Sequence, residues 1–443
     1  MLKITCRDIE ALLKAIVLWE KIKPGQVAKR RIFRKYRILG TSKDRVFTAV
    51  IYGIARRQGI IDKIIAKHYK NPSEINKWLR AALRAFIYEH YFGLGDSNLK
   101  KALIRFTPIV LEKKVGKELA DEYSKIVDKV QKQEYIPVNE LEYLEYKYNV
   151  PIWLINKLEN ILPHNELIAF LEHINKPPPL SFRVNTLKTT VDEVLRELRE
   201  QGYRPWISPY VPTVIKLRRP GKSTFLKLIS EGKIIPQDDS SALASLILNP
   251  QPGELVVDLC AAPGGKTTHL AEIMRNKGRI IAMDLYRDRI QRMKRIIERM
   301  GINIVEIIEM DARYAVNVLG EEIADKVLLD PPCSSTGVLA KHPEARWRWN
   351  EESLRRLVKL QRGLLEVATR LVKPGGRILY TTCSILPEEC EEQVKYILNK
   401  YKGRLKIIEL NKPFSPGLLK GTMRAWPHKH GTTGFFYVLL EKT

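Results

Sequence analysis

The stretch Leu255-Val256-Val257-Asp258-Leu259-Cys260-Ala261-Ala262-Pro263-Gly264-Gly265-Lys266-Thr267-Thr268 decides the fold of the second half of the chain. Its apolar start is typical of a buried parallel strand, and the small residues that follow indicate a tight loop leading into a helix. Three later apolar runs also end in an aspartate, at Asp284, Asp311 and Asp330. Strands that alternate with helices from about residue 246 predict a doubly wound parallel sheet, with these carboxylates along one rim.

The loop after the first of these strands predicts an adenosine-type cofactor. Glycines let the backbone approach a ligand closely, and the following helix offers free N–H groups. Asp284, about twenty residues further on, is placed for ribose hydroxyls, and Asp311 for an adenine amino group. The loop lacks the GxGxxG pattern of dinucleotide sites, Cys260 replaces a Walker A glycine, and Pro263 lacks an N–H for a phosphate. We therefore expect S-adenosylmethionine. The predicted binding residues are Cys260, Ala261, Ala262, Pro263, Gly264, Gly265, Lys266, Asp284, Arg289, Asp311 and Asp330.

Several side chains near this loop have more than one reading. Three roles are open for Lys266: a contact with RNA, a contact with an active-site carboxylate, or a cover for the helix N-terminus. Arg289 either reaches the ribose edge of the cofactor or lies on a solvated helix face. For Cys260 we expect a backbone contact rather than thiol chemistry, and Cys6 and Cys390 are expected to be structural or incidental.

Two cysteines are placed where catalytic side chains would lie. Cys333 and Cys383 follow short apolar runs at 326–329 and 377–380, which predict buried parallel strands. Because ligands bind outside the carboxyl ends of such strands, both cysteines would face one crevice. The alternative is a pair of core cysteines, since Cys is among the most buried residue types. The chain has 5 cysteines without a CxxC pair or His-rich spacing, so no metal is expected.

The charge of the chain predicts a polyanionic partner. Lys and Arg number 76 against 50 Asp and Glu, a net charge of +26 in 443 residues, which favours nucleic acid. No apolar run of about 18 residues suggests a membrane span, and the first residues lack the apolar region of a secretory signal. We expect a cytoplasmic protein with reduced cysteines.

The N-terminal part reads as helical. Val46, Val50 and Ile54 recur at helical spacing, with Thr41 or Ser42 as the expected cap and 56–59 as the expected end of that helix. The basic tract 29–37 interleaves aromatic rings with cations, which indicates either a solvated face or an RNA-contacting surface.

The middle part reads as a small α+β domain. The helical pattern breaks at 133–137, and a Pro-rich turn at 176–179 precedes an alternating strand at 180–185 and a helix at 191–201. We expect three domains, at 1–135, 136–245 and 246–443.

Five motifs closely resemble the RNA cytosine-C5 methyltransferases of the Sun/Fmu (RsmB-like) family, which includes the Nop2/Sun-domain enzymes. The matching segments are Asp258–Thr267, Asp330–Gly337, His342-Pro343-Glu344 with Trp347, Tyr380–Ser384, and Arg424–His428 through Gly434-Phe435-Phe436. The resemblance implies a NusB-like helical domain at residues 1 to about 135, with Ser42-Lys43-Asp44-Arg45 at the matching place. It also implies a small RRM-like domain and a Rossmann-like methyltransferase domain. Thr433 stands where the family usually has Asp.

The resemblance also implies a mechanism. Cys383 is the nucleophile that adds to cytosine C6, Asp330 assists at N3 if it is protonated at that moment, and Cys333 assists release of the product. The target base would be flipped out of its stack. The implied substrate is rRNA of the small subunit, with tRNA as the alternative. Two other classes stay open, a non-catalytic RNA-binding or antitermination factor and an RNA-dependent ATPase. We expect a monomer, although no motif reports the oligomeric state.

Overall fold

The structure is a computed structural model that describes residues 3–22, 25–69, 74–93, 98–218 and 222–443. The chain divides into two compact units, residues 1–156 with 346–348, and residues 157–345 with 349–443. Among the described residues, no helix is both long and apolar enough to cross a membrane.

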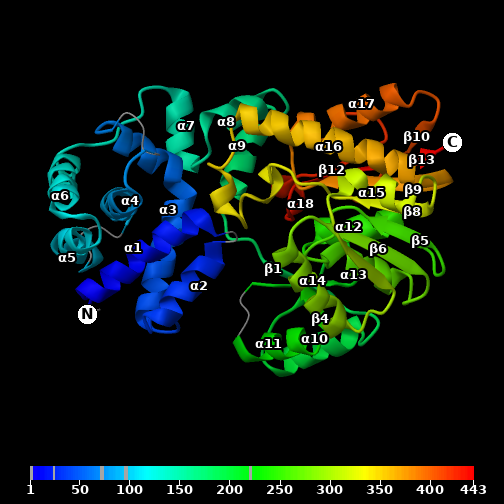
Figure 1. Ribbon diagram of the computed structural model, residues 1–443, viewed down its shortest axis with the longest axis horizontal. Coiled ribbons are helices and arrows are strands. Elements are labelled where there is room, and N and C mark those ends of the chain that lie inside the picture. The colour runs from blue at the N-terminus through cyan, green and yellow to red at the C-terminus, as the bar shows by residue number, and fades with distance from the viewer. Residues whose placement is uncertain (1–2, 23–24, 70–73, 94–97, 219–221) are drawn as a thin grey trace. The chain divides into compact units, whose positions relative to one another are not determined.

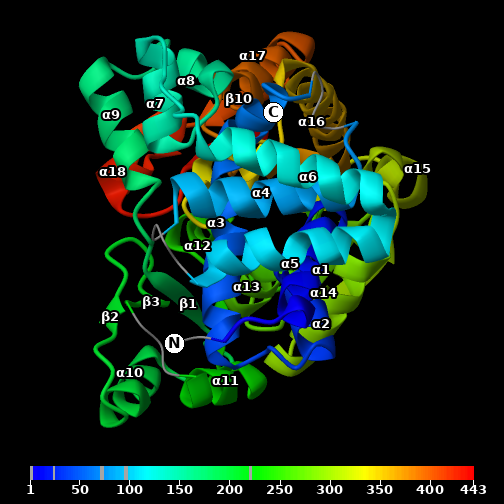
Figure 2. The same ribbon diagram turned by 90° about the vertical axis from the view of Figure 1, so that its left-hand side faces the viewer.

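The first unit is helical and is built around one continuous apolar core. Its helices pack side by side in both views (Figure 1; Figure 2). They are α1 (Cys6–Lys21), α2 (Gly25–Lys35), α3 (Ser42–Ala66), α4 (Lys77–Tyr91), α5 (Asn98–Val115), α6 (Lys117–Gln131) and α7 (Glu140–Tyr148). Thr41 caps α3, as predicted, by accepting a hydrogen bond from the Asp44 N–H.

Helix α3 does not end at 56–59, so that prediction is wrong. The helix runs on to Ala66, because Ile60, Ile61 and two further isoleucines one turn later continue its buried stripe. Gly59 marks a close approach rather than a stop, since a Cβ there would lie 2.0 Å from the Trp347 ring.

The basic tract forms most of α2, with its rings and cations on different faces. The Phe33 ring is fully buried and packs edge-on against Phe47. The Tyr36 hydroxyl donates to Glu10 at 3.1 Å. The rings therefore pack toward the core, with Lys29 over the Phe33 ring at 5.3 Å, and an RNA contact of the exposed cations stays a prediction. The exposed cations are Arg30, Arg31, Arg34, Lys35 and Arg37.

The second unit begins with a small α+β portion. Helix α8 (Ile152–Glu159) begins in the first unit and ends in the second, and α9 (His164–His173) then precedes an antiparallel sheet of order β2-β3-β1-β4. Its strands are β1 (Leu180–Val184), β2 (Trp206–Ile207), β3 (Val214–Leu217) and β4 (Ile234–Pro236), with α10 (Val191–Glu200) and α11 (Lys222–Ser230) on one face. The strand after the Pro-rich turn and the helix from Val191 are confirmed.

The larger sheet of this unit has the order β11-β12-β13-β9-β8-β5-β6-β7, and β10 pairs with β13. Strands β5 to β9 are parallel where they pair, which confirms the predicted doubly wound sheet, and β13 is antiparallel to β9. The strands are β5 (Leu255–Asp258), β6 (Arg279–Asp284), β7 (Val305–Glu309), β8 (Ala324–Leu329), β9 (Val372–Thr382), β10 (Leu405–Ile408), β11 (Ser415–Pro416), β12 (Met423–Ala425) and β13 (Phe435–Lys442).

Helices cover both faces of this sheet (Figure 1). Alternate strand residues point to opposite faces, so Val256 and Leu328 pack with α12 (Asp239–Leu248), α13 (Gly265–Ile273) and α14 (Arg287–Met300). Val257 and Val327 pack with α15 (Ala315–Leu319), α16 (Glu351–Leu371) and α17 (Glu391–Lys400) on the other face. The short helix α18 (Pro427–His430) contacts α9. The fold class is the one expected, a helical domain, a small α+β domain and a Rossmann-like domain.

Candidate active site

The carboxyl ends of the parallel strands carry the aspartates that the sequence pointed to. Asp258 and Asp284 are the last residues of β5 and β6, and Asp330 directly follows β8. Asp311 comes two residues after β7 and caps the 3-10 helix η1 (Ala312–Tyr314). Parallel pairing of β5 with β6 and β8 aligns these positions at one edge of the sheet.

A cavity of about 340 Å³ opens at this edge. Cys260, Asp284, Arg289 and Asp311 of the predicted cofactor set lie in its lining. The described lining does not include 261–266 or Asp330. Apolar side chains complete it, so the cavity combines an apolar wall with carboxylates, the usual make-up of a small-molecule site.

Asp284 organises the loop beside this cavity. It accepts hydrogen bonds from the N–H groups of Ala262 and Tyr286, each at 3.1 Å. Arg289 forms an ion pair with it at 3.1 Å and also donates to the Ala262 carbonyl. Arg289 therefore contacts the loop and the carboxylate instead of facing only solvent. Asp311 pairs with Arg313 at 2.6 Å, and the hydrogen bonds from Arg313 lower its pKa.

Asp258 lies beneath the loop and is buried. Burial raises its pKa to about 7, although the Thr267 hydroxyl donates to it at 2.8 Å. A Cys260 backbone hydrogen bond also reaches Asp258. Burial raises the pKa of the Cys260 thiol well above its ordinary value, so this sulfur is unsuited to act as a nucleophile.

The structure brings Cys333 and Cys383 together. Their sulfur atoms lie 3.1 Å apart, although the residues come from the ends of different strands, β8 and β9. The hydrogen bond with Cys383, together with burial, raises the pKa of the Cys333 thiol well above its ordinary value. Cys333 is thus held as a neutral thiol beside the other sulfur.

Lys266 points to the active-site carboxylate, one of its three readings. Its ammonium group lies 2.5 Å from Asp330 Oδ2 and also lies over the Phe435 ring, 5.0 Å from the ring centroid. The Asp330 side chain is 27% exposed, so a ligand can reach it from the crevice. The pair places a carboxylate near Cys333, because the Asp330 charge contributes to the raised pKa of the Cys333 thiol.

Backbone contacts at Gly337 tie three motifs into one site. The Gly337 N–H donates to the Cys383 carbonyl at 2.9 Å, and the Gly434 N–H donates to the Gly337 carbonyl at 2.8 Å. A Cβ at position 337 would lie 2.2 Å from the Gly434 oxygen. Only glycine allows this approach, which explains its place after the Asp-Pro-Pro-Cys motif.

Two buried arginines support the site, and sequence reasoning missed the role of both. Arg183 of β1 donates to the Gly265 carbonyl at 2.7 Å and forms an ion pair with Glu272 at 2.7 Å, so the small domain holds the first turn of α13. Arg424 of β12 pairs with Glu391 and donates to the Ile385 carbonyl at 2.8 Å, next to the Cys383 loop. The only sequence signal was an arginine within an apolar strand.

Thr433, the departure from the family pattern, lies beside another acid. Its N–H donates to Asp238 Oδ2 at 2.9 Å, and its hydroxyl hydrogen-bonds to Ser240. Asp238 also forms an ion pair with Lys341 at 2.9 Å. A carboxylate from the end of β4 therefore lies beside this segment.

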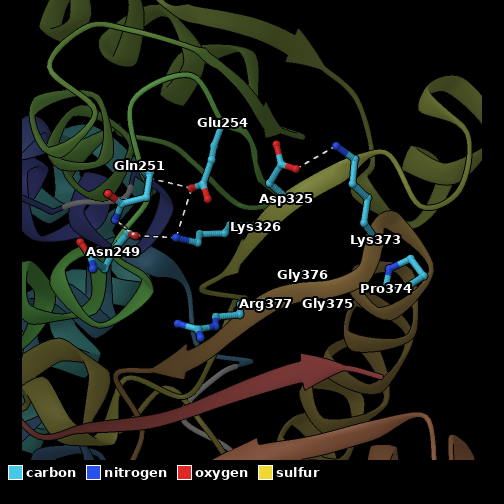
Figure 3. A pocket seen from close by; sticks show the side chains of 10 residues that line it. All are labelled: Asn249, Gln251, Glu254, Asp325, Lys326, Lys373, Pro374, Gly375, Gly376 and Arg377. Atoms are coloured by element: carbon cyan, nitrogen blue, oxygen red, sulfur yellow. Dashed lines mark hydrogen bonds and ion pairs between the residues drawn. The ribbon is translucent and has the colours of Figure 1, made fainter.

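A second hollow, of about 490 Å³, lies at the opposite, amino end of the strands (Figure 3). Its charged side chains pair with one another, Lys326 with Glu254 at 3.1 Å and Lys373 with Asp325 at 2.8 Å. Cys333 and Cys383 follow the carboxyl ends of β8 and β9, at the other end of the strands, so the carboxyl edge is the candidate active site. Among the described residues, no group of three or more His, Cys, Asp or Glu side chains is arranged to hold a metal ion.

Comparison with known families matches all three parts of the chain. Residues 245–441 match the model described as 16S rRNA methyltransferase RsmB/F. Residues 150–224 match the ferredoxin-like domain of the RsmF/B-like methyltransferases, and residues 10–95 match the NusB family.

Similar proteins cover most or all of the chain. The ribosomal RNA small subunit methyltransferase B of Salmonella paratyphi B is 33% identical over 317 residues, 72% of each chain. The crystal structure of PH0851 has a TM-score of 0.91 and 46% identity, with 100% of both chains covered. The structure of NSun6 from Pyrococcus horikoshii with SFG has a TM-score of 0.60 and 26% identity, covering 65% of this chain and 97% of that one.

Proposed function

Because this chain belongs to the RsmB/F family of 16S rRNA methyltransferases, we propose that it methylates C5 of a cytosine in small-subunit rRNA through a covalent Cys383 adduct. The observation that carries the proposal is the 3.1 Å contact between the Cys333 and Cys383 sulfurs, beside the Lys266–Asp330 ion pair. A single nucleophile would need no second sulfur at contact distance. An inactive RNA-binding protein would have no use for either sulfur.

The cavity at the carboxyl edge fits S-adenosylmethionine. Cys260, Asp284, Arg289 and Asp311 would hold it there, with the two carboxylates as acceptors for ribose hydroxyls and an amino group. When bound, it supplies a methyl group that carbon nucleophiles can accept. The structure of NSun6 with SFG supports a ligand site in this fold.

Cytosine C5 is a weak nucleophile, which gives Cys383 its role. The Cys383 thiolate adds to C6, and the electron pair of the C5–C6 double bond becomes available at C5. Negative charge that develops on the ring is relieved by a proton at N3. Asp330 gives N3 that proton if it is protonated at that moment, and the ion pair with Lys266 at 2.5 Å holds the carboxyl group in place.

The N3 proton returns to Asp330 when the C5 electron pair is used to bind the methyl group, and release of the product then needs two further bonds to break. The C5 proton passes to water, and its electron pair re-forms the C5–C6 double bond. The electron pair of the C6–S bond returns to Cys383 as a thiolate. The Cys333 thiol, at 3.1 Å, can donate a hydrogen bond to that leaving sulfur.

The RNA partner is also part of the proposal. The net charge of +26, the NusB match and the ferredoxin-like match support RNA binding by the predicted domains 1–135 and 136–245, outside the predicted catalytic domain 246–443. The name of the Salmonella relative supports rRNA. An rRNA substrate would place the protein in the cytoplasm.

The test uses the full chain with tritiated S-adenosylmethionine and total cellular RNA, followed by separation of rRNA from tRNA and bisulfite sequencing. We expect label in small-subunit rRNA at one cytosine, none with C383A, and a denaturation-resistant protein–RNA adduct with C333A. Label that appears in tRNA would move the substrate to that class. Normal turnover by C383A would remove the covalent mechanism, and RNA binding without any label would favour the non-catalytic class.

A further inference from the structure

A buried carboxylate that takes no part in the proposed chemistry lies directly behind Cys333. Glu389 belongs to the 3-10 helix η4 (Pro387–Glu389), which follows the Cys383 loop, and its side chain is fully buried. Its Oε1 accepts a hydrogen bond from the Ser334 N–H at 2.9 Å, and its Oε2 accepts the Ser334 hydroxyl. The peptide group on the C-terminal side of Cys333 is therefore fixed by a side chain 55 residues away.

The peptide group on the other side of Cys333 is held by Gln361 of α16. The Gln361 amide nitrogen donates to the Pro332 carbonyl at 2.9 Å and to Glu389 Oε1 at 2.9 Å. Gln361 is fully buried as well. The Gln361–Glu389 pair, here named the clamp, thus hydrogen-bonds to the backbone on both sides of Cys333.

The clamp is itself firmly held. The Tyr380 hydroxyl of β9 donates to the Glu389 carbonyl at 2.7 Å, which fixes the main chain of Glu389. Burial raises the pKa of Glu389, and its hydrogen bonds oppose that rise. Burying a carboxyl group costs free energy unless its oxygens are hydrogen-bonded. The four hydrogen bonds that Glu389 and Gln361 make around Cys333 therefore indicate that the position of this loop is important.

Glu389 also takes a hydrogen bond from the Ser384 side chain, next to Cys383, but Cys383 has further supports that do not depend on the Gln361–Glu389 pair. Thr382, immediately before it, pairs with Phe436 of β13. Arg424 donates to the carbonyl of Ile385, two residues after Cys383. Loss of the clamp would therefore displace Cys333 more than Cys383.

We propose that Glu389, together with Gln361, is a positioning residue that holds the Cys333 sulfur against Cys383 for the release step. The inference rests on the proposed function, in which Cys333 assists departure of Cys383. It predicts a selective defect, because attack by Cys383 continues while release slows. A residue that only stabilised the domain would lower both steps together.

The experiment compares the full-length protein with variants at Glu389, using labelled small-subunit rRNA and S-adenosylmethionine, and measures the denaturation-resistant adduct and product formation. Glu389→Leu removes the acceptor for the Ser334 N–H and should raise the adduct at least about tenfold over wild type, as C333A does. Glu389→Gln keeps a carbonyl acceptor at that place and should restore release. Glu392→Leu, an exposed change on the neighbouring helix α17, is the matched control and should leave adduct levels unchanged.

Each outcome decides between the two claims. No adduct with C333A removes the release mechanism and this inference with it. Adduct with C333A but none with E389L overturns the inference alone, whether E389L turns over normally or has lost methyl transfer. If thermal melting shows that E389L does not fold, Gln361→Met is judged by the same criterion. That variant withdraws the donor to Pro332, so an adduct at the wild-type level would refute the clamp.

Discussion

Substituting Gly337 by alanine should damage the active site through a single methyl group. The new Cβ would lie 2.2 Å from the Gly434 oxygen and 2.9 Å from the Cys383 oxygen, and both are backbone atoms that cannot rotate away. The backbone at 337 or 434 must move by roughly 1 Å to relieve the first contact. Position 337 has no positive φ, so the effect is steric rather than conformational.

The magnitude follows from the two contacts. Overpacking of this kind costs about 1–3 kcal/mol, and weakening of the hydrogen bonds between Gly337 and its two partners adds about 1 kcal/mol. A 1 Å displacement of the Cys383 loop should lower the rate of methyl transfer by about 100-fold. We expect a lower midpoint of thermal unfolding and a loss of single-turnover rate, with S-adenosylmethionine affinity retained.

Gly363→Ala is the matched control. Gly363 lies inside α16, and its added Cβ meets nothing within 4 Å. Alanine in a helix interior should stabilise by about 0.5–1 kcal/mol, so the same substitution should act in the opposite direction. If G337A melts and turns over like wild type, the close approach of the three motifs does not exist and the proposed assembly of the site is wrong.

Three further predictions concern charge. Asp258→Asn should flatten the dependence of the free energy of unfolding on pH. Because the pKa of Asp258 is raised to about 7, its contribution to stability is full below about pH 4 and is lost as pH rises through about 7, a difference of at most about 4 kcal/mol. Thermal melts across this range measure it, and an unchanged profile would contradict the burial of the acid. Arg424→Met should lower the free energy of unfolding by about 3–5 kcal/mol, because Glu391 would be left buried and unpaired. The double variant that also carries Glu391→Leu should regain much of this free energy, measured by the same thermal melts. Neutralising the exposed cations of α2 should weaken RNA binding and reduce the slope of log affinity against log salt by up to about 3, measured by filter binding; an unchanged slope would assign that face to solvent. The residues to change are Arg30, Arg31, Arg34 and Lys35.

The fold could be read from the sequence where local pattern and tertiary structure agree. The apolar runs that end in Asp258, Asp284 and Asp330 are strands buried on both faces, and such strands need no alternation to be recognised. The cysteines followed from their places after strands. Their separation of 3.1 Å did not, because it depends on how two loops are held together.

The failures have physical causes. Gly59 looked like a helix end because glycine is a poor helix former, yet the position requires glycine for space beside Trp347. For the basic tract the sequence left open which side chains face outward, and helical periodicity turns Phe33 to the core. The clamp of Glu389 and Gln361 left no local signal, since its partners lie far away along the chain.

The position of β13 in the sheet has a consequence for how the protein is made on the ribosome. This strand is the last in sequence among those described, yet it lies between β9 on one side and β12 and β10 on the other. The Gly434 contact that closes the Cys333 and Cys383 loops immediately precedes it. A nascent chain can complete β5 to β9 earlier, but it exposes the edge of β9 until residues 435–442 emerge and insert. We expect catalytic competence to appear abruptly once residues 434–442 have been made, and the unpaired edge of β9 to be the point where a chaperone has most to protect until then.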